Sequence, residues 1–350
     1  FYFAAPELFP LAVFLGVKLS VKYGNAPGSS ILYNGYGTIL CGGIGDIKRG
    51  FEIGRQGLRL TEKLNTKSFE AEAPLLFNAF IKHWKKHIRE TLKPFEIGFQ
   101  KCLEIGDFEW AANNAYCYSY YFYFAGIELF TIEQNISKYN DAIKKLEQKT
   151  FLIYNQRAWQ VVSNLMGYNE DPTILTGDVF DEKRILKLYQ EENNRSGTCG
   201  LYLDKLILCY LFQQYDRAAN NATNAEKHLV AITGMVPFAV FHFYDSLAQL
   251  AVFPGTPKTN QKRILRKTAQ NQKKIKKWAY HAPMNHLHKW QLVEAEQARV
   301  LEKDGKAITF YKQAIAGAKE NQYIQEEALA NELAAKFYLE KGETETARKY

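Results

Sequence analysis

Small or aromatic residues repeated at helical spacing place the strongest constraint on how this 350-residue chain folds. Three trios are spaced by four and then three residues: Gly50/Gly54/Gly57, Ala218/Ala222/Ala225 and Ala307/Tyr311/Ala314. This spacing keeps the members of each trio on one face of a helix. Because small side chains on that face let a neighbouring helix approach closely, the trios predict tightly packed helix pairs.

A second spacing relates one helix pair to the next. Ala295 stands 12 residues before Ala307, and Ala335 stands 12 residues before Ala347, so the pattern shifts by 40 residues. A small residue at this offset marks the first helix of a tetratricopeptide pair, although the standard period there is about 34 residues. We therefore predict an all-α fold: a right-handed α-solenoid of divergent tetratricopeptide-like (TPR-like) helix pairs with a period of about 40 residues. The alternative is a compact helical domain without repeats.

Helical periodicity extends over nearly the whole chain, and alternation typical of strands is missing. Short breaks such as GNAPGSS, EIGD, GMVP and FPGTPKTN separate the expected helices. The expected helices span 4–23, 29–43, 46–65, 69–86, 89–105, 107–124, 127–147, 149–166, 180–193, 198–213, 215–231, 236–252, 258–279, 284–303, 305–320, 323–341 and 343–350.

One segment interrupts this rhythm. Residues 167–184, GYNEDPTILTGDVFDEKR, contain two glycines, a proline and five acidic residues. We expect N-terminal helical repeats over 1–166, an irregular connection over 167–197 and C-terminal TPR-like repeats over 198–350. The alternative is one continuous superhelix with a surface loop. Both ends of the chain resemble cuts, so we expect a fragment of a longer protein.

Composition indicates a folded protein of a reducing compartment. Hydrophobic residues make up 47% and charged residues 23% of the chain, which is ordinary for a soluble domain. The five cysteines are odd in number and form no CxxC pair, which favours free thiols in the cytoplasm. The most apolar opening, residues 3–17, carries Pro6, Glu7 and Pro10, so we predict no membrane span.

Motifs for phosphate binding and nucleophilic catalysis are not found. The glycine-rich run 35–46, GYGTILCGGIGD, has neither a dinucleotide-binding register nor a Gly-Lys-Ser/Thr sequence. We expect its glycines to permit close helix packing at a turn. Cys199 lies in RSGTCG, which we interpret as a loop-like context, near Arg195, and no surrounding motif indicates a cysteine enzyme.

Two histidine groups invite comparison with metal sites. His286 and His288 are two residues apart on a helix that Pro283 should begin, so they point about 200° apart and do not converge. We expect one of them to pack or cap while the other faces water. His83 and His87 share a helix face, but lysines surround them, which favours a solvated face beside a buried tryptophan. We predict no catalytic, cofactor-binding or metal-binding residue in this chain.

The strongest charge feature is residues 257–278, which hold nine lysines or arginines and no acidic residue. A basic amphipathic helix can meet nucleic acid, acidic lipid or an acidic protein surface, or can be a solvated face. No aromatic residues are interleaved for base stacking, so nucleic acid is an unlikely partner. The candidate interaction surface consists of Lys262, Arg263, Arg266, Lys267, Lys273, Lys274, Lys276 and Lys277.

A run of tyrosines forms the second candidate site. Residues 113–126, NNAYCYSYYFYFAG, hold more phenols than a core easily accommodates without hydroxyl partners. They predict either an aromatic core helix or a groove that binds a ligand. The candidate groove residues are Tyr116, Tyr118, Tyr120, Tyr121 and Tyr123.

Several long strings, in this order, resemble one protein family. They include LYNGYGTILCGGIGDIKRGFEIGRQGL, FNAFIKHWKKHIRETLKP, LYLDKLILCYLF, FHFYDSL, KRILRKTAQNQKKIKKWAYHAPMNHLHKWQLVEAEQAR and EEALANELAAKFYLEKG. They are similar to the central helical region of very large bacterial signalling proteins, known especially from cyanobacteria. Those proteins join a serine/threonine kinase, an AAA/STAND-type ATPase, this TPR-like region, a GAF sensor and a histidine kinase.

The resemblance covers essentially the whole chain but carries over no catalytic motif. The chain has no His-Arg-Asp loop, Asp-Phe-Gly, Walker lysine or phospho-acceptor histidine box, so ATP would bind on other domains of the parent. The resemblance implies a non-catalytic scaffold or sensor that contacts neighbouring domains of the same polypeptide or a protein or peptide ligand. The alternative function is a ligand-sensing or enzymatic pocket among the aromatic helices.

Overall fold

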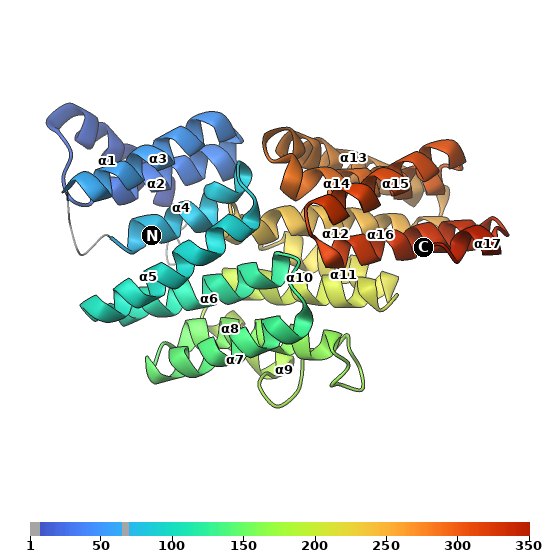
Figure 1. Cartoon of the computed structure of the whole chain (residues 1–350), viewed down its shortest axis with the longest axis horizontal. Helices are drawn as coiled ribbons and strands as arrows, with labels where there is room; N and C mark the ends of the chain where they lie inside the picture. Colours follow the sequence, from blue (N-terminus) through green and yellow to red (C-terminus); the bar gives the residue numbers. More distant parts are fainter. Residues whose placement is uncertain (1–7, 65–69) are drawn as a thin grey trace.

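The computed structural model describes residues 8–64 and 70–350, and within them the protein is all-α (Figure 1). The one β pairing in these ranges is an isolated bridge between Thr176 and Asp181. The α-helices are α1 (Phe9–Tyr23), α2 (Ser29–Thr38), α3 (Ile47–Leu64), α4 (Glu72–Phe80), α5 (Leu92–Ile105), α6 (Phe108–Phe124), α7 (Leu129–Lys145), α8 (Lys149–Leu165), α9 (Glu182–Glu191), α10 (Arg195–Leu211), α11 (Tyr215–Glu226), α12 (Val236–Val252), α13 (Lys258–His281), α14 (Pro283–Val300), α15 (Asp304–Glu320), α16 (Ile324–Glu340) and α17 (Thr344–Ala347).

Local sequence signals account for many helix ends. Asp107 accepts a hydrogen bond from the Trp110 amide and caps α6, while Asn194 caps α10 through the Gly197 amide at 2.8 Å. Pro283 begins α14, as the sequence predicts. The first residues of the helix expected over 4–23 lie outside the described ranges.

The turns between helices recur in one form. Seven of the described turns contain a residue with positive φ, and the next amide donates back to the carbonyl five residues before it. This is the backbone pattern of a Schellman C-cap, which satisfies carbonyls at the helix end. The positive-φ residues are Gly106, Gly167, Asn193, Gln213, Glu302, Gln322 and Gly342. Reuse of one turn gives the packing a repeat-like character.

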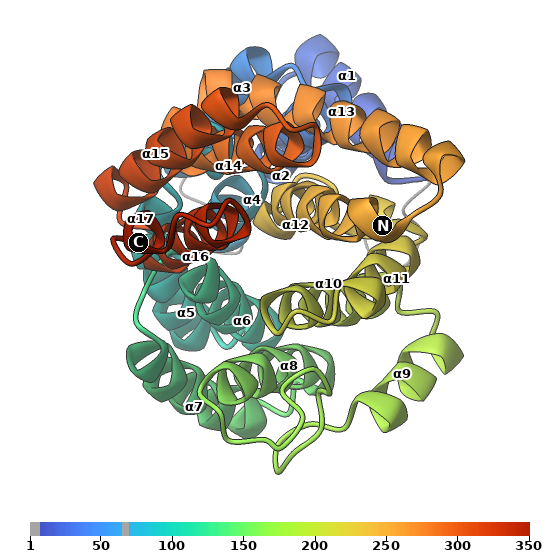
Figure 2. The same ribbon diagram turned by 90° about the vertical axis from the view of Figure 1, so that its right-hand side faces the viewer.

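Helices pack mostly with their neighbours in sequence, and the even-numbered ones also contact each other. From α2 through α16 each even-numbered helix touches the next even-numbered helix, so together they form a continuous inner row. The odd-numbered helices flank this row. Figure 2 views many helices nearly end-on, with α13 and α15 toward one end of the molecule and α7 and α8 toward the other.

The predicted small-residue trios lie where helices approach closely. All nine residues are buried, on α3, α11 and α15. A Cβ added to Gly50 would lie 2.8 Å from the Gly37 carbonyl oxygen on α2, too close for any side chain. In the glycine-rich run, a Cβ on Gly42 would meet the Gly234 Cα at 2.5 Å. The prediction that these glycines permit close packing is confirmed.

The prediction of a helix over 69–86 is wrong in its second half. α4 ends at Phe80, and the chain continues through two 3₁₀ turns, Lys82–Trp84 and Ile88–Thr91. Trp84 is fully buried, and its ring centre lies 5.3 Å from that of Trp278 on α13. Tertiary contacts therefore override the local period here.

Polar contacts also join two parts of the chain that are about 200 residues apart in sequence. Asn285 donates to the His83 carbonyl at 2.7 Å, and Arg89 donates to the Gln322 carbonyl at 2.8 Å. We call the contacts among residues 83–89, 124–126, 285–289 and 321–326 the closing network. It makes the array turn back on itself, so helices far apart in sequence share one connected core.

Candidate functional site

The five candidate tyrosines of α6 do not converge on one groove. Tyr116, Tyr120 and Tyr121 are buried, whereas Tyr118 and Tyr123 are half-buried. The Tyr121 hydroxyl donates to the Ala79 carbonyl, and Tyr118 stacks on Phe122. Burial raises the pKa of the Tyr116 phenol well above its usual value. The run is therefore largely an aromatic core helix, as one of the two sequence interpretations predicted.

Two of these tyrosines nevertheless face a cavity. Tyr116 and Tyr120 line a space of about 430 Å³ enclosed by residues of α1, α2, α4, α6, α8, α10 and the start of α12. We call it the Arg157 cavity, after the one basic residue among the described residues that line it. Most of the wall is aliphatic or aromatic. The inner row of even-numbered helices therefore encloses a space of the size that small-molecule sites have.

Arg157 is held rigidly at this cavity. Its Nε donates to Asp204 Oδ2 at 2.8 Å, and Nη1 donates to the Gly197 carbonyl at 3.4 Å. The guanidinium lies 5.4 Å from the ring centre of Tyr120 and 5.6 Å from that of Tyr154. The Arg157 and Asp204 side chains are 2% and 0% exposed, so water screens their attraction weakly.

Burial and pairing act in opposite directions on this ion pair. Burial raises the pKa of the Asp204 carboxyl to about 6, although Arg157 and the Tyr120 hydroxyl favour the carboxylate. Burial alone would lower the pKa of Arg157, but Asp204 and the surrounding phenols raise it well above the usual value. Arg157 therefore stays charged inside an apolar wall. Such a buried charge requires its partner, because an unpaired charge in this setting is strongly destabilising.

Two further hydrogen-bond donors line the cavity. Within the described residues, neither the Trp110 indole N–H nor the Tyr116 hydroxyl has a hydrogen-bond acceptor, and both residues line the space. By contrast, the Tyr154 hydroxyl donates to Asn194 at 2.7 Å. The polar groups without partners at this wall are therefore mainly donors.

A second cavity, of about 610 Å³, lies farther along the same helices. Ile207 and Leu211 of α10 line it, whereas Gly200 of α10 lines the Arg157 cavity. Asp204 stands between these positions along α10 and lines neither space. Nothing in the sequence pattern paired Asp204 with Arg157, although Asp204 is the lone acid in the apolar run 201–212.

The basic surface lies on α13, and seven of its eight residues are exposed. Lys267 is the exception: it is half-buried and pairs with Glu226 at 2.7 Å and with Asp245 at 3.4 Å. Lys274 lies 3.3 Å from the His242 ring, and Lys276 lies over the Trp290 ring at 5.3 Å. The exposed residues are Lys262, Arg263, Arg266, Lys273, Lys274, Lys276 and Lys277, and none forms an ion pair within the described residues.

A buried carboxylate on α12, Asp245, explains why Lys267 of α13 forms an ion pair. Asp245 on α12 is fully buried and also accepts from Asn271 at 2.8 Å. Burial raises the pKa of the Asp245 carboxyl, and Lys267 acts against that rise. Lys267 therefore anchors α13 to α12, while the other basic residues remain available on the outer surface.

The prediction that one of His286 and His288 faces water is wrong, because both are buried. His286 stacks on Trp84 with ring centres 5.9 Å apart, and His288 lies 4.8 Å from the Tyr323 ring. Burial lowers the pKa of both imidazoles well below the ordinary value. The two rings pack in different aromatic clusters, in accord with the prediction that they do not converge.

His83 and His87 are also more enclosed than predicted. His83 is buried and bonded to the Gly234 carbonyl at 2.8 Å, and half-buried His87 is bonded to the Asn321 carbonyl at 3.0 Å. The predicted solvated helix face is therefore wrong, because this segment belongs to the closing network. Cys199, which we placed in a loop, is a fully buried residue of α10, and burial raises its thiol pKa to about 12.

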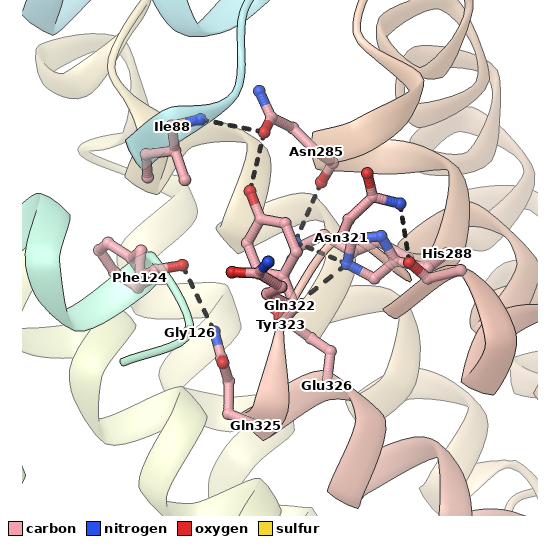
Figure 3. A network of polar contacts seen from close by, with 12 residues as sticks. Ile88, Phe124, Gly126, Asn285, His288, Asn321, Gln322, Tyr323, Gln325 and Glu326 are labelled. Atoms are coloured by element: carbon pink, nitrogen blue, oxygen red, sulfur yellow. Dashed lines mark hydrogen bonds and ion pairs between the residues drawn. The ribbon is translucent and has the colours of Figure 1, made fainter. Parts of the chain in front are cut away.

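The closing network centres on two residues of α14, Asn285, which Figure 3 shows, and Lys289. Tyr323 donates its hydroxyl proton to Asn285 Oδ1 at 2.8 Å, which also accepts from the Ile88 amide. Buried Lys289 pairs with buried Glu326 at 3.1 Å and donates to the Asn285 carbonyl. Sequence periodicity gave no signal for these pairs, since their members lie on different helices.

The described residues contain no metal-ligand cluster and one segment apolar enough to cross a membrane. Among residues 8–64 and 70–350, no group of three or more His, Cys, Asp or Glu side chains could hold a metal ion. In the same ranges one segment, Val236–Gly255, is long and apolar enough to cross a membrane by composition, and 78% of its most apolar window is buried inside the protein. The core helix of a soluble protein meets that criterion equally well.

Comparison with known families finds no family model that matches the chain, and comparison with curated proteins finds no matching relative. Function must therefore be argued from the cavity and the basic surface themselves.

Proposed function

We propose that this chain is a non-catalytic helical-repeat module that mediates contacts between proteins or domains in a cytoplasmic signalling protein. In this proposal the helix pairs form a right-handed α-solenoid of divergent TPR-like repeats. The parent would be an ATPase and kinase of the kind that the sequence resembles, with ATP bound on other domains. The observation that supports this proposal most is the row of exposed basic residues on α13.

An acidic protein surface is the partner that this row fits best. Seven exposed basic side chains lie on one helix, and like charges at helical spacing repel each other. A carboxylate-rich surface would relieve that repulsion. Each exposed ion pair contributes only about 0.2–1 kcal/mol, so several must act together. Binding should therefore weaken strongly with salt, because the screening length falls from about 10 Å at 0.1 M to about 3 Å at 1 M.

Charge reversal tests the basic surface. A variant with Lys262, Arg266, Lys273 and Lys277 changed to Glu should lose binding to a glutamate-rich peptide at 0.1 M salt and keep its helicity. A matched variant carries the same charge change on exposed lysines of α7 and the first residue of α8, and should bind normally; it changes Lys138, Lys144, Lys145 and Lys149 to Glu.

The outcome separates the candidate partners of α13. Equal binding by both variants would make the row an ordinary solvated face and would contradict the proposal. A DNA duplex and anionic lipid vesicles serve as competing probes. The proposed acidic partner would also be wrong if the unaltered protein bound DNA or vesicles but not the acidic peptide, and the α13 variant lost that binding.

A second function, ligand sensing, is favoured by the Arg157 cavity. Its volume of about 430 Å³ lies within the range of small-molecule sites. Residues of seven helices enclose it, so an occupant would bridge the first and second halves of the inner row. In this proposal a bound ligand changes how the helices pack and hence how the module presents its surfaces. The sequence analysis also allowed an enzymatic pocket in these aromatic helices.

A further inference from the structure

We infer that the Arg157 cavity binds a small amphipathic carboxylate, with the carboxylate at the Arg157, Trp110 and Tyr116 donors and the apolar body against the remaining wall. This inference rests on the ligand-sensing function proposed above and is independent of the basic surface on α13.

The wall determines the body of the ligand. Phe9 and Val13 of α1, Phe80 of α4, Phe151 of α8 and Met235 before α12 line the space. An apolar body gains free energy by leaving water for such a wall, at about 25 cal/mol for each Å² removed from solvent. A ligand that is polar throughout would find too few partners here.

The donors determine the head group. The guanidinium of Arg157 lies in the lining, and a planar guanidinium can bind a carboxylate through two parallel hydrogen bonds. The Trp110 indole N–H can only donate, and the Tyr116 hydroxyl has no acceptor within the described residues. A carboxylate supplies the oxygen acceptors that all three groups require.

Charge placement opposes a cationic head group at the Arg157 end of the cavity. Among the described lining residues, Arg157 and Glu109 are the charged ones; Arg157 is buried, whereas Glu109 is exposed at the end of the cavity formed by the start of α6. Asp204 lies behind Arg157, where it accepts from Nε. Asp204 thereby fixes the orientation of the guanidinium, and pre-organised donors bind with less loss of conformational freedom. An ammonium head group at this position would be repelled by the guanidinium, and Asp204 is already paired with Arg157.

A head-group series tests this inference without altering the protein. Dodecanoate, dodecan-1-ol and dodecylamine share one chain, so they differ in head group alone. Each is titrated against the protein with bound 1-anilinonaphthalene-8-sulfonate, and loss of dye fluorescence reports displacement. Dodecanoate should bind at least about tenfold more tightly than the alcohol, which corresponds to 1.4 kcal/mol, and the amine should bind weakest. Equal binding of acid and alcohol would overturn the assigned head group.

Two adjacent positions on α1 locate the site. Ala12 lines the cavity, whereas Leu11 is 65% exposed on the outer side of the same helix. Ala12→Trp should fill the space and abolish dodecanoate binding, and Leu11→Trp should leave it unchanged. Tyr116→Phe, which removes one hydroxyl, should weaken dodecanoate about threefold or more and leave the alcohol nearly unchanged. Unchanged binding by Ala12→Trp would place the ligand elsewhere and refute the inference.

The charge-reversed α13 variant keeps the two proposals separate. It should bind dodecanoate like the unaltered protein, because α13 contributes nothing to the cavity lining. Loss of peptide binding with retained dodecanoate binding is the result we expect. Failure of the whole head-group series to bind would overturn the carboxylate inference and leave the test of the basic surface unaffected.

Discussion

Protonation of His83 should make the protein markedly less stable in mild acid. The His83 side chain is 1% exposed, and burial lowers the pKa of its imidazole from 6.5 to about 4. The hydrogen bond to the Gly234 carbonyl acts in the opposite direction but is the smaller effect. The unfolded chain therefore binds this proton more tightly than the folded protein does. The stability that neutral His83 contributes is complete above pH 6.5 and is lost as the pH falls from 6.5 toward 4.

The magnitude follows from the two pKa values. Between pH 7 and pH 5, linkage gives a loss of about 2 kcal/mol in the free energy of unfolding from this one group. His83→Gln removes the titration, so the variant should be less stable at pH 7 but should lose about 2 kcal/mol less than the parent on going to pH 5. Comparing the parent with His83→Gln cancels the contributions of other titrating groups to the pH dependence of stability. One of these is Asp204, whose raised pKa makes the folded protein more stable as the pH falls.

Urea unfolding at pH 5, 6, 7 and 8 provides the measurement. Tryptophan fluorescence follows unfolding, and one of the five tryptophans, Trp84, has its ring centre 4.5 Å from that of His83. His281→Gln is the control, since His281 is only half-buried and should change the pH slope less. The reasoning is wrong if the parent and His83→Gln lose equal stability between pH 7 and pH 5.

Three further substitutions should change stability in ways that thermal unfolding can measure. Gly42→Ala should destabilise by about 1–3 kcal/mol, because its Cβ would meet Gly234 Cα at 2.5 Å; an unchanged melting temperature would contradict this contact. Lys289→Met should cost about 3–5 kcal/mol by leaving buried Glu326 without its cation, and the double variant Lys289→Met/Glu326→Leu should recover most of that loss. If the double variant is no better than the single one, the uncompensated charge is not the cause. Tyr323→Phe should cost only about 1 kcal/mol, because Asn285 Oδ1 keeps the Ile88 amide; a loss above about 3 kcal/mol would be inconsistent with that.

Helices could be predicted from sequence where local signals decide them. Pro283 begins α14, and the acid-free run 257–278 lies almost wholly within α13. The small residues of α3 could be predicted as a contact face, because their spacing alone puts them on one side. These features depend on residues within a few turns of one another, which a periodic pattern records.

The enclosed groups could not be predicted in the same way. His83 is bonded to Gly234, which is 151 residues away in sequence, and His288 packs on Tyr323, which precedes α16. Helical spacing within one segment contains no information about such partners. Arg157 and Asp204 lie on α8 and α10 and meet across the inner row. The tyrosine run was ambiguous for the same reason: which phenols face a cavity depends on the helices opposite α6.

The closing network has a consequence for how the molecule comes apart. In an open array each repeat depends only on its neighbours, so the ends can fray one unit at a time. Here the bonds from Asn285 to the backbone at His83 and Lys86 staple an early segment to a late one. Releasing either segment removes support from the other. Hydrogen exchange should therefore show residues 83–126 and 285–326 unfolding together as one cooperative unit, and not independently of each other.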